Sequence, residues 1–207
     1  MKTPLHPTNP VHPKRVAVLG AGESGLSAAL LLAAEGARVT VYDAAPLEKL
    51  ERAAAELSAA GVKLCVGDGA PLVEQGTELC VLSPGIDPAT ELVQVFHRAG
   101  VPVMGELELA FQRCACPVVA ITGTNGKTTT TQRVEAMFKG AGLATKACGN
   151  IGPSFSRCVG ESARLQVMTV EVSSFQLEAI FRFRPRIAVW LNFAPDHLDR
   201  YASTEDY

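Results

Sequence analysis

A glycine loop near the middle of the chain carries the residues with the clearest chemistry, Thr122-Gly123-Thr124-Asn125-Gly126-Lys127-Thr128. Gly123 and Gly126 let successive backbone N–H groups converge into a nest for an anion. Lys127 can neutralise the β- and γ-phosphates of a nucleotide, and the Thr128 hydroxyl can ligate Mg²⁺. The alternative is a plain glycine turn with a solvated lysine, but the apolar strand before the loop and the helix after it favour a phosphate site. We therefore expect ATP to bind through Gly123, Thr124, Asn125, Gly126, Lys127, Thr128 and Thr129.

A metal ion at such a loop needs a further ligand from a neighbouring strand. Glu171 ends the apolar run 167–170, so its carboxylate is expected at the sheet edge where the glycine loop lies. It is a candidate Mg²⁺ ligand, and the alternative is that it only caps the turn at Ser173-Ser174. His197 follows the apolar strand at 187–193 on the same edge, which leaves a functional and a structural role equally open.

A second glycine loop, Gly20-Ala21-Gly22-Glu23-Ser24-Gly25, follows the first apolar strand and opens a helix. Asp43 ends the next strand, as the ribose-binding acid does in dinucleotide-binding units. The helix N-terminus offers unpaired N–H groups to a phosphate. This pattern serves any pyrophosphate, so NAD, a UDP-sugar and a turn without a ligand all remain open. Ser83-Pro84-Gly85-Ile86 comes after another strand and is expected on the same edge.

Strands alternate with helices along the chain, which indicates βαβ units and a parallel-sheet α/β fold. Expected strands span residues 15–19, 38–42, 63–66, 79–82, 101–104, 118–121, 145–148, 165–172 and 187–193, and expected helices span 24–35, 47–60, 90–99, 106–113 and 127–139. The pattern restarts near Cys116, so we divide the chain into an N-terminal tail (1–14), a Rossmann-like domain (15–115) and a P-loop ATP-binding domain (116–207). The last domain has few elements for a covered parallel sheet, so we expect it to be incomplete. Trp190 lies in mid-strand and is expected in the core.

Composition and charge exclude several classes of protein. Hydrophobic residues make up 47% and charged residues 19% of the 207, which is typical of a soluble protein with a filled core. The net charge of −2 argues against nucleic acid or an anionic membrane as partner, and no apolar run is long enough to cross a bilayer. The six cysteines form no Cys-x-x-Cys motif, which favours reduced thiols in a cytosolic protein. Cys114 and Cys116 are either a redox or metal pair or, as we favour, small residues at a domain junction.

Four segments together resemble the Mur ligase family of ATP-dependent peptidoglycan enzymes. They are residues 121–129 (ITGTNGKTT), 149–152 (GNIG), 171–178 (EVSSFQLE) and 196–201 (DHLDRY). The last two resemble the D-glutamate-adding branch of the family. The first domain also fits, with Ser83-Pro84-Gly85 and the run at 105–108, so the resemblance covers nearly the whole chain beyond the tail. The strict P-loop pattern, Gly-x-x-x-x-Gly-Lys-[Ser/Thr], requires glycine at the position of Ile121. The resemblance implies that this departure is a trait of the family.

The resemblance implies a UDP-muramoyl substrate, not NAD, in the first domain. The implied nucleotide-sugar contacts are Ser24, Asp43, Ser83, Pro84 and Gly85, and those near the acyl end of the substrate are Asn150, Ser173 and His197. The implied catalytic residues are Lys127, Glu171 and His197, and the implied metal ligands are Thr128, Glu171 and His197. Two departures from the family pattern are Ala44-Ala45, where other members place polar residues, and Glu23, an acid inside a phosphate-facing turn.

The reaction implied by the resemblance is amide-bond formation through an acyl phosphate, with ATP and Mg²⁺ as cofactors. Its substrates would be UDP-N-acetylmuramoyl-L-alanine and D-glutamate, and we expect a monomer in the bacterial cytoplasm with no nucleic-acid or membrane partner. Full-length members continue past residue 207 with a metal-bridging lysine and a third domain, so we expect this chain to be a fragment with little ligase activity alone. The competing interpretations are an NAD-dependent oxidoreductase, which leaves the P-loop unexplained, and a non-catalytic nucleotide-binding module.

Overall fold

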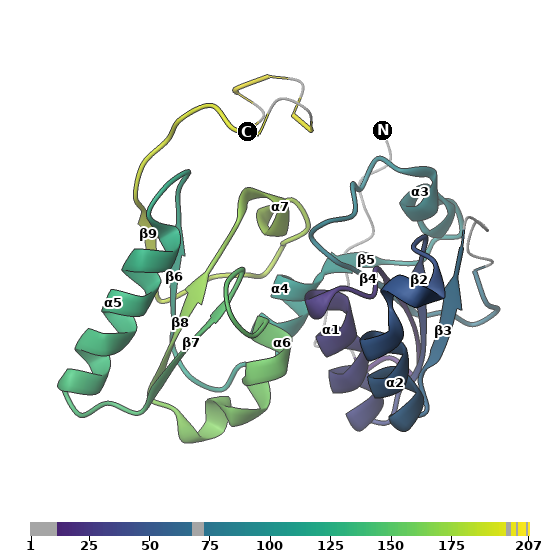
Figure 1. Ribbon diagram of the computed structural model, residues 1–207, viewed down its shortest axis with the longest axis horizontal. Helices are drawn as coiled ribbons and strands as arrows, with labels where there is room; N and C mark the ends of the chain where they lie inside the picture. Colours follow the sequence, from purple (N-terminus) through teal and green to yellow (C-terminus); the bar gives the residue numbers. More distant parts are fainter. Residues whose placement is uncertain (1–11, 68–72, 198–199, 202, 206) are drawn as a thin grey trace.

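The computed structural model describes residues 12–67, 73–197, 200–201, 203–205 and 207, and contains two parallel α/β units lying side by side (Figure 1). The expected parallel-sheet α/β fold class is confirmed. The first sheet ends at Gly105 and the second begins at Val118, so the proposed division near residue 116 falls between the sheets and stays a prediction. Most of the tail proposed at 1–14 lies outside the described residues.

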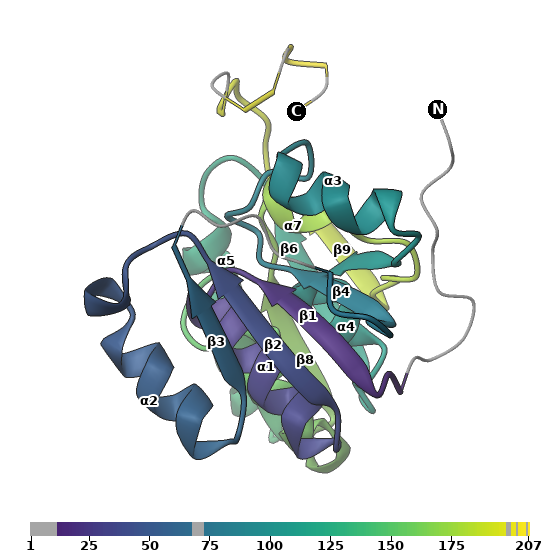
Figure 2. The same ribbon diagram turned by 90° about the vertical axis from the view of Figure 1, so that its right-hand side faces the viewer.

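The first unit is built on a fully parallel sheet in the order β3-β2-β1-β4-β5. Its strands are β1 (Arg15–Leu19), β2 (Arg38–Asp43), β3 (Lys63–Val66), β4 (Leu79–Leu82) and β5 (Val103–Gly105). Four of them, β3, β2, β1 and β4, lie next to one another in Figure 2. Because the chain returns from β3 to the far side of β1, the loops after β1 and β4 start from neighbouring strands. Such a switch point is where open α/β sheets bind ligands.

Helices cover both faces of the first sheet. Alternate side chains of a strand point to opposite faces, so Val16 and Val18 of β1 pack with the helices α1 (Glu23–Ala34) and α2 (Glu51–Ala59). Ala17 and Leu19 pack on the other side with α3 (Glu91–Arg98). The sheet beneath the loops is therefore packed by apolar side chains on both faces.

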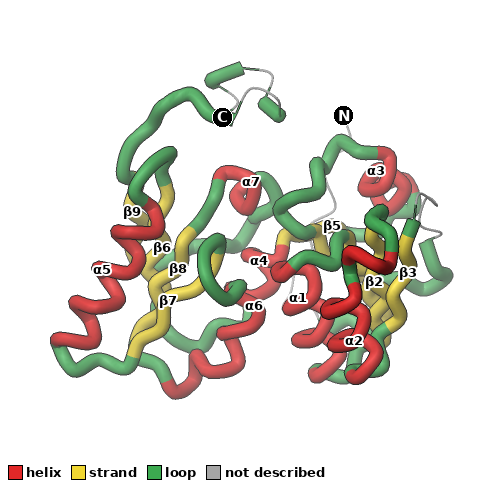
Figure 3. Tube along the Cα trace, in the orientation of Figure 1, coloured by secondary structure: helices red, strands yellow, loops and turns green. Residues whose placement is uncertain are grey.

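The second unit has a parallel sheet in the order β7-β8-β6-β9. Its strands are β6 (Val118–Thr122), β7 (Thr145–Gly149), β8 (Val167–Glu171) and β9 (Ile187–Trp190). Val119 and Ile121 pack against α5 (Lys127–Gly140), whereas Val118 and Ala120 face α4 (Glu106–Phe111) and α6 (Phe155–Cys158), as the helix positions in Figure 3 illustrate. The glycine loop at 122–128, called the phosphate loop below, follows β6, which lies inside this sheet between β8 and β9.

Helix α4 joins the two units, because its apolar side packs into the core of the second one. Glu106 Oε1 accepts a hydrogen bond of 2.6 Å from the backbone N–H of Ser156. Glu108 Oε2 accepts three hydrogen bonds, of 3.0, 3.0 and 2.9 Å, from the backbone N–H groups of residues 181–183. The Glu106 contact holds the start of α6, and the Glu108 contacts hold the segment that leads into β9.

Ion pairs also attach the segment after α4, and α6 of the second unit, to helices of the first unit. Arg113 binds both carboxylate oxygens of Glu35 at 2.6 and 2.7 Å. Arg157 of α6 contacts Glu23 at 2.8 Å and Glu56 at 3.3 Å, on α1 and α2. The acid that departs from the family pattern in the first glycine loop, Glu23, is thus explained by a contact between the units.

The structure corrects several expected elements. The helix expected at 47–60 is broken at Leu50 into a 3₁₀ turn (Leu47–Lys49) and α2, β5 starts at Val103, β8 starts at Val167 and β9 ends at Trp190. Three short helices were not expected: α6, a 3₁₀ helix (Val159–Arg164) and α7 (Ser174–Leu177). They are too short for a visible apolar period.

The expectation that Trp190 lies in the core is wrong. The residue is 71% exposed, because the described residues leave most of β9, the outer strand of this sheet, uncovered: Ile187, Ala188 and Trp190 are all exposed. The indole N–H donates to the carbonyl of Asn192 at 3.0 Å.

Candidate active site

The loop after β6 curves around the start of α5, and two glycines permit the curve. Gly123 has a φ of +142° and Gly126 a φ of +82°, a region that strains residues with a side chain. The first turn of α5 contains no acidic residue and its N-cap makes no side-chain hydrogen bond, so the positive end of the helix dipole faces the loop. Lys127 Nζ donates to the carbonyls of Gly123 at 2.7 Å and Thr124 at 3.0 Å. The ammonium group therefore lies over the loop, where a phosphate would bind.

Asn192, two residues after β9, holds this loop and was missed in the sequence. The N–H of Asn125 donates to Asn192 Oδ1, and Asn192 Nδ2 donates to the carbonyl of Asn125, both at 2.9 Å. A Cβ at Gly123 would lie 3.1 Å from the Asn192 nitrogen, so the glycine permits this close approach. A polar residue at the carboxyl end of a strand was the available signal, but the pairing of β9 with β6 had to be known first.

Glu171 ends β8 opposite Ile121 of β6, which brings the carboxylate to the strand that carries the phosphate loop. The residue is 1% exposed. Its Oε1 accepts a 3.0 Å hydrogen bond from Asn150 Nδ2, whereas Oε2 is buried without a hydrogen-bond partner among the described residues. A buried, unpaired carboxylate oxygen is costly, and a cation bound to it would compensate. Carboxylate and hydroxyl oxygens are the hard ligands that Mg²⁺ prefers, and the metal-ligand roles of Glu171 and Thr128 stay predictions.

The turn after β7 packs directly on Glu171. Gly149 has a φ of +114°, and a Cβ there would lie 2.2 Å from the Glu171 carbonyl oxygen. The same oxygen accepts a 2.9 Å hydrogen bond from the Asn150 N–H. Asn150 is therefore bound to Glu171, the candidate metal ligand, through both its backbone and its side chain. Its role at the acyl end of the substrate stays a prediction.

Ser173 starts α7 with a capping box. Its Oγ accepts from the Gln176 N–H at 3.4 Å, and its own N–H donates to Gln176 Oε1 at 2.9 Å. Gln176, and not Glu171, therefore completes the cap of this turn. The predicted contact between Ser173 and substrate is not tested by this local role.

His197 lies well beyond the end of β9, in a segment that passes over α7. Its ring centroid is 5.0 Å from that of Phe175, and its Nδ1 is 3.0 Å from Asp196 Oδ1. The described part of the chain contains no group of three or more His, Cys, Asp or Glu side chains placed to hold a metal ion. The ring of His197 contacts Phe175, Asp196 and Tyr207 among the described residues, and its metal and catalytic roles stay predictions.

In the first unit, the loops after β1 and β4 touch. Ser83 Oγ donates to the Gly20 carbonyl at 3.3 Å, and Gly20 has a φ of +90°. A Cβ at Gly25 would lie 1.9 Å from the Gly20 oxygen and 2.5 Å from Ser83 Oγ. Among the predicted contacts, Ser24 precedes Gly25, and Pro84 and Gly85 follow Ser83, so the structure brings these segments together at one edge of the sheet.

Both carboxylate oxygens of Asp43 accept hydrogen bonds from backbone N–H groups. Oδ2 accepts from the N–H of Ala21 at 2.6 Å and Oδ1 from that of Ala45 at 2.8 Å. Asp43 thus braces the glycine loop from the neighbouring strand β2. Its predicted contact with a nucleotide-sugar would have to be made alongside these bonds.

Comparison with known proteins identifies the two units. The N-terminal domain of MurD-like Mur ligases matches residues 14–105, and the Mur ligase middle domain matches residues 121–207. The chain belongs to the Mur ligase family. The UDP-N-acetylmuramoylalanine–D-glutamate ligase of Pelotomaculum thermopropionicum is 43% identical, over 94% of this chain and 43% of its own length. The enzyme of that name from Streptomyces coelicolor is 45% identical, over 94% of this chain and 42% of its own length.

Solved structures agree with this assignment at the level of the fold. The murein peptide ligase of Neisseria meningitides aligns with a TM-score of 0.59 and 21% identity, over 93% of this chain and 64% of that one. The corresponding enzyme of Psychrobacter arcticus gives a TM-score of 0.54, also at 21% identity, over 90% of this chain and 44% of that one. The chain spans less than half the length of the curated Mur ligases that it matches.

Two further observations concern parts of the molecule outside the loops. Cys114 and Cys116 place their sulfur atoms 3.9 Å apart, too far for a disulfide, and burial beside Cys114 raises the pKa of Cys116 to about 12. The thiol of Cys116 is therefore protonated at neutral pH. In the described ranges no helix combines the length and the apolar composition needed to span a membrane.

Proposed function

We propose that this chain supplies the ATP and nucleotide-sugar sites of an ATP-dependent amide ligase that adds D-glutamate to UDP-N-acetylmuramoyl-L-alanine during peptidoglycan precursor synthesis. The observation that carries the proposal is the phosphate loop with an unpaired, buried carboxylate oxygen of Glu171 on the adjacent strand. The names of relatives at 43% and 45% identity supply the two substrates.

The chemistry of the loop suits carboxylate activation. An amine does not displace oxygen from a carboxylate at neutral pH, so the substrate carboxylate would first attack the γ-phosphate of ATP, which would give an acyl phosphate and release ADP. D-Glutamate nitrogen would then displace phosphate and form the amide. Lys127 and the N-terminus of α5 would offset the charge that develops on the transferred phosphoryl group. Thr128 and Glu171 would hold Mg²⁺, which when bound neutralises phosphate charge.

The remaining assignments divide between the two units. Ser24, Asp43, Ser83, Pro84 and Gly85 would hold the nucleotide-sugar, while Asn150, Ser173 and His197 would lie at its acyl end, with His197 as a further metal ligand. We place the protein, as a monomer, in the bacterial cytoplasm, which supplies ATP and keeps thiols reduced.

Ligand-induced thermal stabilisation tests the proposal. A ligand at 100 times its Kd stabilises the folded state by about 2.7 kcal/mol, which raises the Tm of a protein of this size by about 5–10 °C. We expect such shifts with Mg-ATP and with UDP-N-acetylmuramoyl-L-alanine, and none with NAD. The variant Lys127→Ala should lose the ATP shift and keep the nucleotide-sugar shift.

Stabilisation by NAD without stabilisation by the nucleotide-sugar would reject the ligase and favour an oxidoreductase. Stabilisation by ATP alone would leave a nucleotide-binding module. Both outcomes are read on the wild-type chain, so they do not depend on the folding of a variant.

A further inference from the structure

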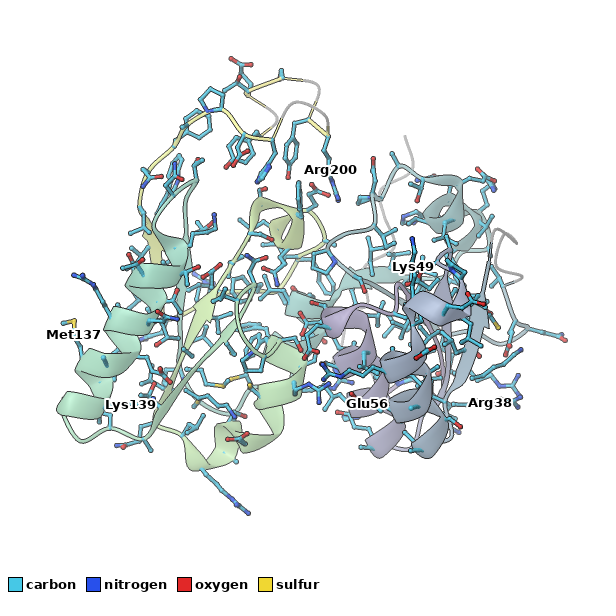
Figure 4. All side chains as sticks on the ribbon, viewed as in Figure 1. Arg38, Lys49, Glu56, Met137, Lys139 and Arg200 are labelled. Atoms are coloured by element: carbon cyan, nitrogen blue, oxygen red, sulfur yellow. The ribbon has the colours of Figure 1, made fainter. Side chains whose placement is uncertain are left out.

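Arg200 lies between the two units, where the C-terminal segment passes over α7 (Figure 4). Its Nη1 donates to the Pro84 carbonyl and its Nη2 to the Ile86 carbonyl, both at 3.2 Å. Nη2 also contacts Glu178 Oε2 at 2.6 Å, and the side chains of Arg200 and Glu178 are only 13% and 21% exposed. One guanidinium group therefore ties the loop after β4 in the first unit to the end of α7 in the second.

An aromatic platform orients this guanidinium group. Its central carbon lies 4.3 Å above the ring of Phe175, in the geometry of a cation–π contact. Tyr201 stacks on the same ring at 6.0 Å and donates to the second oxygen of Glu178 at 2.6 Å. His197 packs on Phe175 at 5.0 Å. The loop of the first unit and His197 of the second are thus held by one cluster.

We propose that Arg200 is a positioning residue for the nucleotide-sugar, acting through the Ser83–Ile86 loop. The inference rests on the proposed function, which assigns that loop to the nucleotide-sugar. Arg200 binds two backbone carbonyls of the loop, so it sets where the loop lies without being one of its ligand-contacting side chains. Phe175 contacts both Arg200 and His197. Phe175 therefore connects the nucleotide-sugar loop, through Arg200, with the residue proposed for the acyl end of the substrate, His197.

Within the described residues, the contacts of Arg200 with the first unit are confined to the Ser83–Ile86 loop. Helix α4 and the ion pairs of Arg113 and Arg157 hold the units together at other points. Loss of Arg200 should therefore leave both units folded and displace mainly the Ser83–Ile86 loop.

Isothermal titration of the 207-residue chain tests this role with Arg200→Ala, Arg200→Lys and the matched control Arg98→Ala. Arg98 is an exposed arginine of the first unit that pairs with Glu91. We expect Arg200→Ala to weaken binding of UDP-N-acetylmuramoyl-L-alanine about tenfold, within the usual range for coupled sites, with ATP binding unchanged. Arg200→Lys should recover part of the loss, because an ammonium group can pair with Glu178 but lacks the planar fork that reaches two carbonyls. The control should bind both ligands like wild type.

A second variant, Glu178→Gln, should show the same ligand pattern with a smaller loss, since it keeps an oxygen facing Arg200 but removes its charge. Equal nucleotide-sugar binding by wild type and Arg200→Ala overturns the inference and leaves the proposed function standing. An equal loss of ATP and nucleotide-sugar binding also overturns it, because the role would then be general to the fold. Failure of the wild-type chain to bind the nucleotide-sugar rejects the proposed function, and the inference with it.

Discussion

At the scale of single residues, close backbone approaches place the candidate ligands of both glycine loops. Gly25 and Gly149 sit where a Cβ would meet a carbonyl oxygen, that of Gly20 in one case and that of Glu171 in the other. The glycine patterns were visible in the sequence because a turn and the helix after it are contiguous. Gly25 also approaches Ser83 Oγ in the loop after β4, and the oxygen that Gly149 approaches belongs to β8, so only the fold shows these neighbours.

Gly25 offers a prediction with a matched control. Gly25→Ala should destabilise the chain by about 1–3 kcal/mol or more, because its Cβ would overlap the Gly20 oxygen. Gly22→Ala meets nothing within 4 Å and, because Gly22 is the N-cap of α1, should cost no more than about 1 kcal/mol. Urea unfolding of the two variants measures both values. Equal stability of the two variants would show that the loop relaxes around the added methyl group.

At the scale of elements, the sequence predicted helix α4 but not the contacts that its two glutamates make. The helix expected at 106–113 is present, at Glu106–Phe111, but its two glutamates are buried. A surface helix with acids in its first turn is the ordinary interpretation of such a segment. The buried carboxylates instead accept backbone N–H groups from a segment far along the chain, which no local pattern contains.

Glu108 tests this element. Glu108→Ala should lower the free energy of unfolding by about 2–4 kcal/mol, because three backbone N–H groups lose a charged acceptor. Glu108→Gln keeps an acceptor oxygen and should lose less. Glu91→Ala, which removes an exposed ion pair, should have an effect below about 1 kcal/mol. A loss for Glu108→Ala no larger than that of the control would mean that these hydrogen bonds do not hold the segment.

At the scale of the whole molecule, the two units meet across a buried acid. Glu106 is 1% exposed, and burial raises its pKa above the ordinary 4.5, although the hydrogen bond from Ser156 opposes the shift. The folded state therefore holds the proton more tightly than the unfolded state. Its contribution to stability is complete below pH 4.5 and is lost as the pH rises through the raised pKa.

Glu106→Gln should remove this dependence, since glutamine does not titrate and its oxygen can still accept from Ser156. The variant should gain stability relative to wild type as the pH rises above 4.5, by at most about 1.4 kcal/mol per pH unit. Urea unfolding of both proteins between pH 4 and pH 8 measures the difference. Parallel stability curves would show that Glu106 titrates alike in the folded and unfolded states.

The sequence alone determined the features that depend on neighbouring residues in the chain. The phosphate loop around Lys127, the glycine loop at 20–25 and the alternation of strands and helices are of this kind, because a turn and a helix start are built from contiguous backbone. The tertiary structure decided which strands become neighbours. It placed Asn192 on the phosphate loop, left Glu171 Oε2 unpaired and brought Arg200 onto the loop after β4. These contacts join residues far apart in the chain, and they exist only once strand order and packing bring the segments together.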